Sequence, residues 1–279
     1  MQTEIISRQQ HIDSIIHGLM SHEDHLSYSS LSCFKQSPQK FIDYKLGIKD
    51  ETDAMLYGSM LHCLVLEPAD FYNRYHAIDD TEKCTEIGGA KPRATKVYKE
   101  WYANAISEAG GKQIVETSDF HAARIAADNI CNNRASAKIL QQAIVKEKPA
   151  EWEFKNFKFH GFIDGIGDRI IFDLKTCTDA SPDKFQREIF KRGYYLQAAM
   201  YLHAEGKVLD YYIIAVDRKN GVSVHKLDQG LIEHGANEYN DLLDKFNHCI
   251  LTDGFDQSFD FFSPRHDGIY MCEKPAYLY

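Results

Sequence analysis

The chain has 279 residues, of which 44% are hydrophobic and 26% are charged. These values are ordinary for a globular protein with one large domain or two small ones. Its formal net charge of −9 disfavours a nonspecific nucleic-acid binder, which usually carries a basic surplus. The charge still permits a metal-dependent nuclease, because cations neutralise the carboxylates of such a site and phosphate contacts need only a local basic strip.

Targeting and redox signals are absent from the sequence pattern. No apolar run reaches the ~18 residues of a membrane span, and the first ten residues, MQTEIISRQQ, lack the apolar segment of a signal peptide. Seven cysteines are scattered singly, without the Cys-x-x-Cys pairs of zinc or iron–sulfur sites. We therefore expect a reduced, cytoplasmic location and no membrane partner.

The N-terminal third is predicted to be helical. Residues 1–25 resemble a loosely attached helix. A serine within 27–30 can cap a short helix that ends before Pro38. The stretch DAMLYGSMLHCLVLEP then predicts a buried helix over about 53–66, which the proline at its end closes.

A mainly helical segment follows. Residues 81–93 contain two adjacent glycines and a proline, which predict a loop. Helices are expected at about 94–109, 118–131 and 134–145.

The centre of the chain changes to strand-like alternation. AEWEFKNF, KFHGFID and RIIFDLKT are separated by turn signals, so they predict three antiparallel strands within residues 150–176. Helices are then expected after Ser181-Pro182 and up to Gly206, where the glycine suits a C-cap. DYYIIAVDR and GVSVHKL predict a strand and its hairpin partner, and residues 231–251 predict a final amphipathic helix. The core order is helix, three strands, helix, strand.

The stretch IIFDLKT places an acid and a base two positions apart inside an apolar run. Because side chains alternate along a strand, Phe172 and Leu174 can enter a core while Asp173 and Lys175 share the opposite face. For an isolated Asp-x-Lys, the ordinary explanation is a solvated sheet face with a neighbouring ion pair. The surrounding residues decide between that explanation and a site.

Asp164 on the preceding strand supplies a second carboxylate. If the turn centres on Gly167-Asp168, residue 164 lies opposite residue 171, and Asp173 becomes its diagonal neighbour at ~7–8 Å. A slip of one residue would place the two acids on opposite faces. Adjacent carboxylates repel unless a cation lies between them, and such hard oxygen ligands suit Mg²⁺, with Mn²⁺ as a substitute.

Lys175 beside such a metal site indicates phosphodiester hydrolysis. A lysine there can position or deprotonate the attacking water, or stabilise negative charge in the transition state. A bound divalent ion would lower the pKa of that water and contact the phosphate oxygen.

Other residues are candidates with ordinary alternatives. His62 lies in an apolar helix, where a lone histidine is more often a satisfied core residue than a ligand. Glu151 or Glu153 could add a carboxylate from the first strand, although their alternation with aromatic residues also fits a solvated strand face. Gln197 and Tyr201, spaced i and i+4 on one helix, could reach the scissile region. They could equally be polar side chains exposed to solvent on the surface of that helix.

Two basic clusters could contact phosphates, and each is equally typical of a solvated helix face. The first follows the candidate site at three-to-four spacing and comprises Lys184, Arg187, Lys191 and Arg192. The second is weaker and comprises Lys91, Arg93, Lys96 and Lys99.

Taken together, these pieces resemble a known superfamily. The order αβββαβ, with Asp at the end of the second strand and Asp-x-Lys on the third, resembles the PD-(D/E)xK nucleases. Within them the sequence is similar to the RecE-type exonucleases, the exodeoxyribonuclease VIII group often encoded by phages and prophages. The similar pieces span about 26–202 and are LSYSSLSCFKQSPQKF, AMLYGSMLHCLVLEP, GFIDGIGD, IIFDLKTCTDAS and GYYLQAAMY. The G-S-x-L-H-x-L-x-L-E-P piece is quite specific to this group, whereas Asp-x-Lys alone is not.

The resemblance implies a fold and a domain plan. It implies a mixed α+β (α/β) restriction-endonuclease-like core whose central mixed sheet is flanked by helices. Residues 1–25 would be an N-terminal helical extension, and 26–279 a single nuclease domain. That domain would contain a helical insertion at about 80–147 and end in a helix plus a tail.

The resemblance also implies roles for individual residues. His62, Asp164 and Asp173 would be metal ligands, helped by the backbone carbonyl of Leu174, and Lys175 would be the catalytic lysine. The pair Gln197 and Tyr201 matches the Q-x-x-x-Y element of RecB-like nucleases and would belong to the catalytic set. Ile163 stands where the superfamily name has proline, and Asp173 where many members have glutamate; neither change removes a metal ligand.

For function, the resemblance implies 5′→3′ digestion of linear double-stranded DNA from its ends. The products would be 3′ single-stranded tails for recombination. The family further implies a ring-shaped homo-oligomer and work beside a RecT-like annealing protein, in a bacterial or phage-infected cell. Two alternatives are a related nuclease of other polarity or structure specificity, and a non-catalytic module that binds DNA ends. The intact Asp164, Asp173 and Lys175 disfavour the non-catalytic module.

Overall fold

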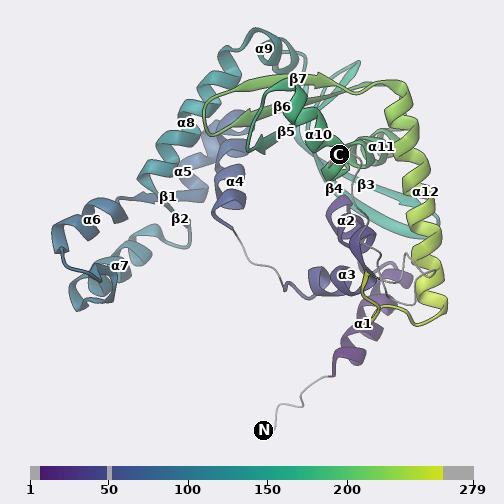
Figure 1. The fold of residues 1–279 in the computed structure, drawn as a ribbon, viewed down its shortest axis with the longest axis horizontal. Helices are drawn as coiled ribbons and strands as arrows, with labels where there is room; N and C mark the ends of the chain where they lie inside the picture. The colour runs from purple at the N-terminus through teal and green to yellow at the C-terminus, as the bar shows by residue number, and fades with distance from the viewer. Residues whose placement is uncertain (1–6, 49–51, 260–279) are drawn as a thin grey trace, which may run out of the picture.

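A five-stranded mixed sheet forms the centre of the computed structural model, which describes residues 7–48 and 52–259 (Figure 1). Its strands are ordered β3-β4-β5-β6-β7. Their bounds are β3 Val145–Phe154, β4 Phe157–Ile166, β5 Ile170–Cys177, β6 Asp210–Asp217 and β7 Val222–Lys226. The pairs β3–β4, β4–β5 and β6–β7 are antiparallel, and β5–β6 is parallel. Because a parallel pair needs a crossover, two helices connect β5 to β6.

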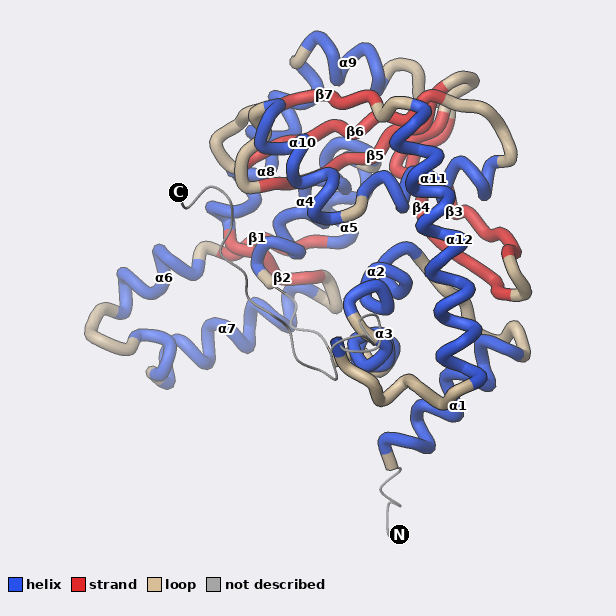
Figure 2. The backbone as a smooth tube through the Cα atoms, turned by 45° about the vertical axis from the view of Figure 1, so that its right-hand side comes forward, coloured by secondary structure: helices blue, strands red, loops and turns tan. Residues whose placement is uncertain are grey.

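Helices cover both faces of this sheet, so the architecture has three layers (Figure 2). One layer contains α1 Arg8–Met20, α2 Tyr28–Gln36, α3 Pro38–Lys45, α10 Pro182–Arg192, α11 Tyr194–Glu205 and α12 Gln229–Leu251. The other contains α4 Asp53–Leu66, α8 Thr117–Asn132 and α9 Arg134–Leu140. The predicted mixed α+β class with a central mixed sheet flanked by helices is confirmed.

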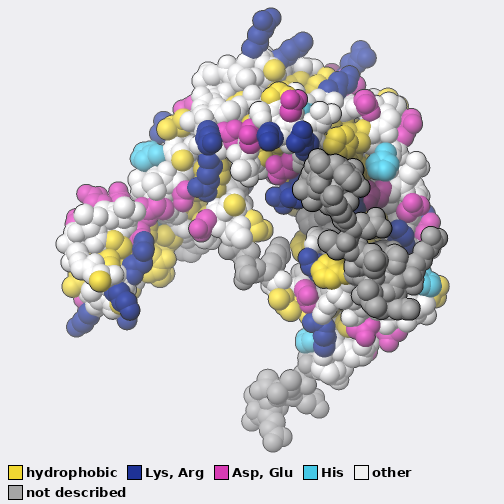
Figure 3. Space-filling view, viewed as in Figure 1, with side chains coloured by type: hydrophobic (Ala, Val, Ile, Leu, Met, Phe, Trp, Pro, Cys, Tyr) yellow, Lys and Arg dark blue, Asp and Glu magenta, His cyan; other side chains and the backbone are white. Residues whose placement is uncertain are grey.

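A smaller unit lies between α4 and α8. It comprises η1 Pro68–Asp70, α5 Phe71–Arg74, β1 Tyr75–Ile78, α6 Asp80–Ile87, η2 Pro92–Ala94, α7 Lys96–Ala109 and β2 Gln113–Glu116. The strands β1 and β2 pair in parallel as a separate two-stranded sheet. The α6–α7 arm projects away from the main sheet, and a concavity separates it from the N-terminal helices (Figures 1 and 3). The predicted loop over 81–93 is wrong in its first half, because Asp79 caps α6 by accepting the N–H of Glu82.

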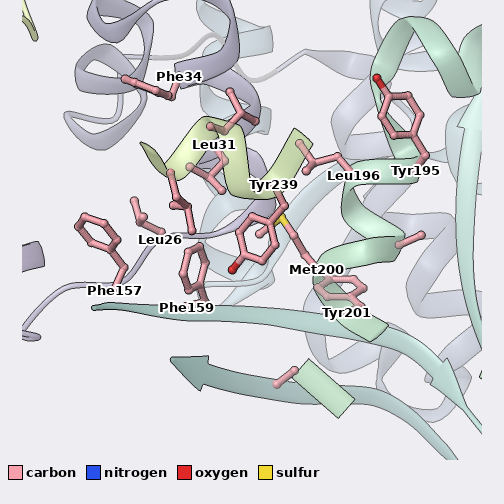
Figure 4. Packing of buried hydrophobic residues seen from close by; sticks show 14 of the residues in the cluster. Leu26, Leu31, Phe34, Phe157, Phe159, Tyr195, Leu196, Met200, Tyr201 and Tyr239 are labelled. Carbon is pink, nitrogen blue, oxygen red and sulfur yellow. The ribbon is translucent and has the colours of Figure 1, made fainter. Parts of the chain in front are cut away.

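The largest core lies between the sheet and the layer of α1, α2 and α10–α12. Figure 4 shows Phe159 of β4 beside Tyr239 of α12, and their rings pack edge to face at a centroid distance of 5.4 Å. Phe157 of β4 packs against Phe246 of the same helix. Trp152 donates its indole N–H to the Tyr239 hydroxyl at 3.1 Å, which satisfies a polar group inside an aromatic cluster. α12 is 23 residues long, yet no helix in the described ranges is long and apolar enough to cross a membrane.

The second core lies on the opposite face of the sheet. Phe172 and Leu174 are buried there against α4 and α8, as the alternation of IIFDLKT predicts. A third cluster joins α4 to the small unit through Tyr57, Met60 and Phe71.

Two expected boundaries need correction. The N-terminal helix is present but is not loosely attached, because Ile12 and Leu19 are buried in the largest core. The expected helix over 134–145 ends at Leu140, and β3 begins five residues before its predicted start, at Val145. Proline inside a strand usually argues against it, but Pro149 is tolerated here because β3 is an edge strand of the sheet. The expected C-terminal tail beyond residue 259 lies outside the described residues.

We predict that Gly165→Ala destabilises the protein by about 1–3 kcal/mol or more, because the new methyl group would overlap a buried ring. A Cβ at Gly165 would lie 2.1 Å from the Phe172 ring, which is fully buried. Thermal or urea unfolding measures the change. As a control, Gly230→Ala in the first turn of α12, where the nearest atom is 3.6 Å away, should change stability by less than about 0.5 kcal/mol. Equal stability of the two variants would contradict the tight β4–β5 packing.

Candidate metal centre and active site

The candidate site lies where the pairing of β4 with β5 stops. The two strands pair only at Gly165–Phe172 and Ile166–Ile171, and Asp164 and Asp173 are the next residues beyond these pairs. Oδ2 of Asp164 accepts the backbone N–H of Leu174 at 2.6 Å. In a continued β4–β5 ladder the N–H of Leu174 would donate to a backbone carbonyl of β4. Here it donates to the Asp164 carboxylate instead.

The register differs from the sequence-based prediction by two residues. Ile171 pairs with Ile166 and not with residue 164, because the turn centres on Asp168-Arg169 and not on Gly167-Asp168, and it is closed by the N–H of Gly167 bonded to the carbonyl of Ile170. A shift of two residues preserves the facing of side chains, whereas a shift of one would have reversed it. Asp164 and Asp173 therefore still lie on neighbouring positions of the two strands, as predicted, although the predicted register was wrong.

Asp173 and Lys175 form a buried ion pair. Nζ of Lys175 lies 2.6 Å from Oδ2 of Asp173, and Nε2 of Gln197 donates to Oδ1 of Asp173 at 3.0 Å. Asp173 is 3% exposed, so this face of the strand is not the solvated sheet face of the ordinary explanation. Nζ of Lys175 also lies 5.0 Å from the centroid of the Tyr194 ring, a cation–π contact that helps to fix the ammonium group.

A second group of side chains could hold a cation. One ligand atom each of His62, Glu147 and Asp164 lie within 4.8 Å of one another. His62 comes from α4, with Nδ1 at 3.6 Å from Oδ2 of Asp164. Three separate elements, α4, β3 and β4, thus bring these ligand atoms together. The resemblance implied His62 and Asp164 as metal ligands, whereas Glu147 was not expected.

Glu147 is a site residue that the sequence interpretation missed. Its neighbours Lys146 and Lys148 pair with Gly165 and Ile163, so Glu147 stands opposite Asp164. Its backbone has φ of +47°, which is uncommon for a residue with a side chain and marks local strain at this point of β3. Glu151 and Glu153, the expected candidates on this strand, are exposed, and Glu153 lies near His22 instead.

The electrostatics of the site favour a bound cation. Burial, together with the nearby Asp164 carboxylate, raises the pKa of Glu147 to about 7. Burial also raises the pKa of Asp173, although Lys175 opposes this shift. Burial by itself would lower the pKa of Lys175, but the carboxylates of Asp173 and Asp164 outweigh it and raise that pKa, so the ammonium form is retained.

The donor set fits a divalent metal ion. Two carboxylates that repel each other and one imidazole supply oxygen and nitrogen ligands, a combination that suits Mn²⁺ as well as Mg²⁺. Asp173 is held by Lys175 and Gln197 beside this group. The N–H of Leu174 is bonded to Asp164, and the role expected for its carbonyl remains a prediction.

An open hollow of about 820 Å³ gives access to these groups. His62, Glu147 and Lys175 line it together with Arg74 and Arg192. Lys and Arg side chains gather along the rim of the concavity in the space-filling view (Figure 3).

Of the four basic residues predicted on the helix after Ser181, Arg192 alone is among the residues that line this hollow. The other three, Lys184, Arg187 and Lys191, are exposed elsewhere on α10. In the weaker cluster of Lys91, Arg93, Lys96 and Lys99, which lies on the α6–α7 arm, Arg93 is paired with Asp80 and Lys96 with Glu100.

Gln197 and Tyr201 are buried in the protein interior next to the site and do not line the hollow. Both are 6% exposed, and neither is among the residues that line the hollow. Gln197 reaches Asp173, as described above. Tyr201 packs edge-on against Trp152 and lies so close to Gly161 that a Cβ there would be 2.8 Å from its ring. The geometry favours a positioning role for both residues over contact with a substrate.

Comparisons with known proteins agree with this architecture. A family model described as "PDDEXK-like domain of unknown function (DUF3799)" matches residues 27–256. An exonuclease candidate from Eubacterium rectale has a similar crystal structure, with a TM-score of 0.57 and 12% identity over 100% of this chain and 96% of that chain. A search of the curated proteins gave no match.

Two further solved structures have low similarity. LHK-Exo in complex with dAMP has a TM-score of 0.30 and 17% identity, with 57% of this chain and 84% of that chain covered. SSO0001 has a TM-score of 0.26 and 14% identity, with 68% and 88% covered.

We predict that Glu147→Gln stabilises the metal-free protein at pH 8 but not at pH 5. The unfolded chain loses the Glu147 proton near the ordinary pKa of 4.5, whereas the folded chain keeps it up to about pH 7. Between these values the folded state binds more protons, so the free energy of unfolding falls as pH rises. Removing the ionisable group removes this loss, and in EDTA the Tm advantage of the variant should grow by a few degrees from pH 5 to pH 8.

The matched control is Glu151→Gln, an exposed position on the same strand, for which no such pH-dependent difference is expected. At pH 8, Mn²⁺ should raise the Tm of the wild type more than that of Glu147→Gln. A Tm difference between wild type and Glu147→Gln that stays constant with pH would contradict the placement of Glu147 beside Asp164.

Proposed function

Because the chain belongs to the PDDEXK-like family that matches residues 27–256, we propose that it is a metal-dependent nuclease that hydrolyses phosphodiester bonds in DNA. The observation that carries this proposal is the convergence of His62, Glu147 and Asp164 beside the Asp173–Lys175 pair, at one open hollow. Carboxylates and an imidazole that can hold a metal ion, next to an ammonium group, form a set of groups that can support metal-assisted phosphodiester hydrolysis.

Each residue has a distinct part in this proposal. His62, Glu147 and Asp164 would hold the ion, with Asp173 beside them, and the carbonyl of Leu174 would be a further oxygen ligand. A divalent ion bound there supplies charge neutralisation for the phosphate and a more acidic water molecule. Lys175, held in place by its ion pair with Asp173, stabilises negative charge that develops on the phosphate and orients the water. Gln197 and Tyr201 keep Asp173 and β4 in place.

We further propose that the enzyme is an exonuclease of the RecE type. The sequence pieces that resemble that group support this, and the Eubacterium rectale structure named as an exonuclease candidate has the same overall fold. On this proposal the enzyme digests linear double-stranded DNA 5′→3′ with Mg²⁺ or Mn²⁺, leaves 3′ single-stranded tails, forms a homo-oligomeric ring and works with a RecT-like annealing protein. A ring around DNA gives processivity without strong binding by each acidic subunit.

Digestion of linear duplex DNA tests the exonuclease proposal directly. We expect loss of a 5′-labelled linear duplex in Mg²⁺ or Mn²⁺ but not in EDTA, with the label released early and a closed-circular duplex left intact. Cutting of the circle would replace the exonuclease proposal with an endonuclease. Binding of DNA ends without any cleavage would favour the non-catalytic module.

We predict that Asp173→Asn and Asp173→Ala each reduce DNA cleavage at least about 100-fold, because the carboxylate beside the cation is lost. The asparagine variant preserves the shape of the side chain, so its Tm shows whether the fold is retained. The control is Asp168→Ala in the exposed β4–β5 turn, which should cleave normally. Normal cleavage by the Asp173 variants would remove this residue from the site.

For Lys175→Ala we predict a similar loss in the rate of cleavage with little loss of DNA affinity, because the ammonium acts on charge that develops during the reaction. Single-turnover cleavage and fluorescence-anisotropy binding in EDTA separate the two effects. Loss of binding with an unchanged single-turnover rate would instead make Lys175 a phosphate clamp.

A further inference from the structure

A second hollow, of about 300 Å³, continues the candidate active site along the ends of β5 and β6. It shares Ala54, Thr176 and Arg192 with the larger hollow, so the two form one groove. Beyond the shared residues it is lined by Tyr57, Thr178 and Arg218, among others. A substrate strand whose scissile phosphate lies at Lys175 would extend into this groove in one direction.

Arg218 is held at the mouth of this second hollow. Its guanidinium carbon lies 4.3 Å from the centroid of the Tyr57 ring, and Tyr57 is 3% exposed, so a buried ring fixes the guanidinium plane. The Arg218 side chain is 52% exposed. Within the described residues its one hydrogen bond is to Asp119, at 3.4 Å, which is near the outer limit for such a bond. Most of its five N–H donors therefore remain available to a ligand.

The turn that carries Arg218 is rigid. The neighbouring Asp217 accepts backbone N–H groups from Ala180, Lys219 and Gly221 at 2.9, 2.8 and 3.0 Å. The bond from Ala180 ties the β6–β7 turn to the segment that follows β5, and the other two bonds close the turn on itself. The guanidinium is thus preorganised, which limits the entropy that it would lose on binding a ligand.

We propose that Arg218, stacked on Tyr57, binds a backbone phosphate of the substrate strand next to the scissile phosphate. The planar guanidinium matches two phosphate oxygens, and the hydroxyls of Thr176 and Thr178 in the same hollow add donors of the kind that contact the nucleic-acid backbone. Such a contact positions the strand and carries no base preference. This inference rests on the proposed nuclease function and adds to it a substrate-binding residue on the β6–β7 turn.

The competing explanation is that Arg218 only tethers the turn to Asp119 of α8. That pair is exposed and long, and exposed ion pairs contribute little to stability. A purely structural Arg218 would affect unfolding and not the binding of DNA, so the two explanations predict different measurements.

The test compares Arg218→Ala and Arg218→Lys with Arg169→Ala. Arg169 is an exposed arginine in the β4–β5 turn, at the opposite end of β5 and roughly 30 Å away along that strand at about 3.3 Å per residue. Binding of a fluorescent DNA oligonucleotide is measured by anisotropy in EDTA over a salt series, so that no cleavage occurs. We expect Arg218→Ala to bind about tenfold more weakly, with a salt slope reduced by about 1, while Arg169→Ala binds as the wild type does. Arg218→Lys should recover part of the affinity because it keeps the charge.

A neutral-phosphate scan locates the contact. Oligonucleotides with one methylphosphonate linkage at successive positions are tested against wild type and Arg218→Ala. At one linkage, next to the scissile one, the loss of binding free energy caused by the methylphosphonate and the loss caused by Arg218→Ala should not add. Both changes remove the same contact between Arg218 and the phosphate charge. In cleavage assays Arg218→Ala should raise KM with kcat nearly unchanged.

The possible outcomes separate this inference from the proposed function. Equal binding by Arg218→Ala and Arg169→Ala, or losses that add at every linkage, would overturn the Arg218 contact while leaving the nuclease in place. A salt slope for Arg218→Ala equal to that of the wild type would also overturn it, since no phosphate charge would then be contacted. A wild-type protein that neither binds nor cleaves DNA would overturn both the contact and the nuclease.

Discussion

The bond between the Asp164 carboxylate and the N–H of Leu174 determines the geometry of the candidate site. It ends the β4–β5 ladder after two pairs without leaving a buried donor unsatisfied, which would destabilise the fold. Beyond this bond β4 and β5 no longer pair, and the next residues of β5, Lys175 and Thr176, line the hollow.

The end of the β4–β5 pairing also brings several charged side chains together in a small volume. Asp164, Asp173 and Glu147 face one retained ammonium group and a histidine, so the metal-free site holds more potential negative charge than positive. The raised pKa values of Glu147 and Asp173 are the consequence of burial together with this imbalance. A divalent ion would relieve it, and until one binds, the fold carries a locally unfavourable arrangement of the kind that functional sites often retain.

The sequence was sufficient for the central pair and insufficient for the edge strand. Alternation in IIFDLKT assigned Phe172 and Leu174 to a core and Asp173 and Lys175 to the other face, because the period of a strand does not depend on its partners. The exact partner of Asp164 depended on which two residues form the centre of the turn, which glycine and aspartate signals do not define uniquely. The predicted register was wrong by two residues, and a shift of two leaves the Asp164 and Asp173 side chains on the same face of the sheet.

Glu147 shows where local patterns cease to be informative. It precedes Pro149, which argues against a strand unless the strand is known to lie at a sheet edge, and that is a tertiary property. Its left-handed backbone also breaks the regular alternation from which Glu151 and Glu153 were proposed. The sequence predicted that the first strand, β3, would supply a further carboxylate. It did not predict that this carboxylate would be Glu147.

Helix α4 explains why the G-S-x-L-H spacing is informative. Gly58 and His62 are four residues apart and share one helix face. A Cβ at Gly58 would make only an ordinary contact with the Thr176 hydroxyl, at 3.4 Å, so α4 passes beside the end of β5 here, and His62 reaches Asp164 one turn further along the helix. The adjacent face of α4 carries Tyr57, which packs against the small unit and supports Arg218. One helix therefore sets the positions of a metal-ligand candidate and of the proposed phosphate contact, and a displacement of α4 would disturb both together.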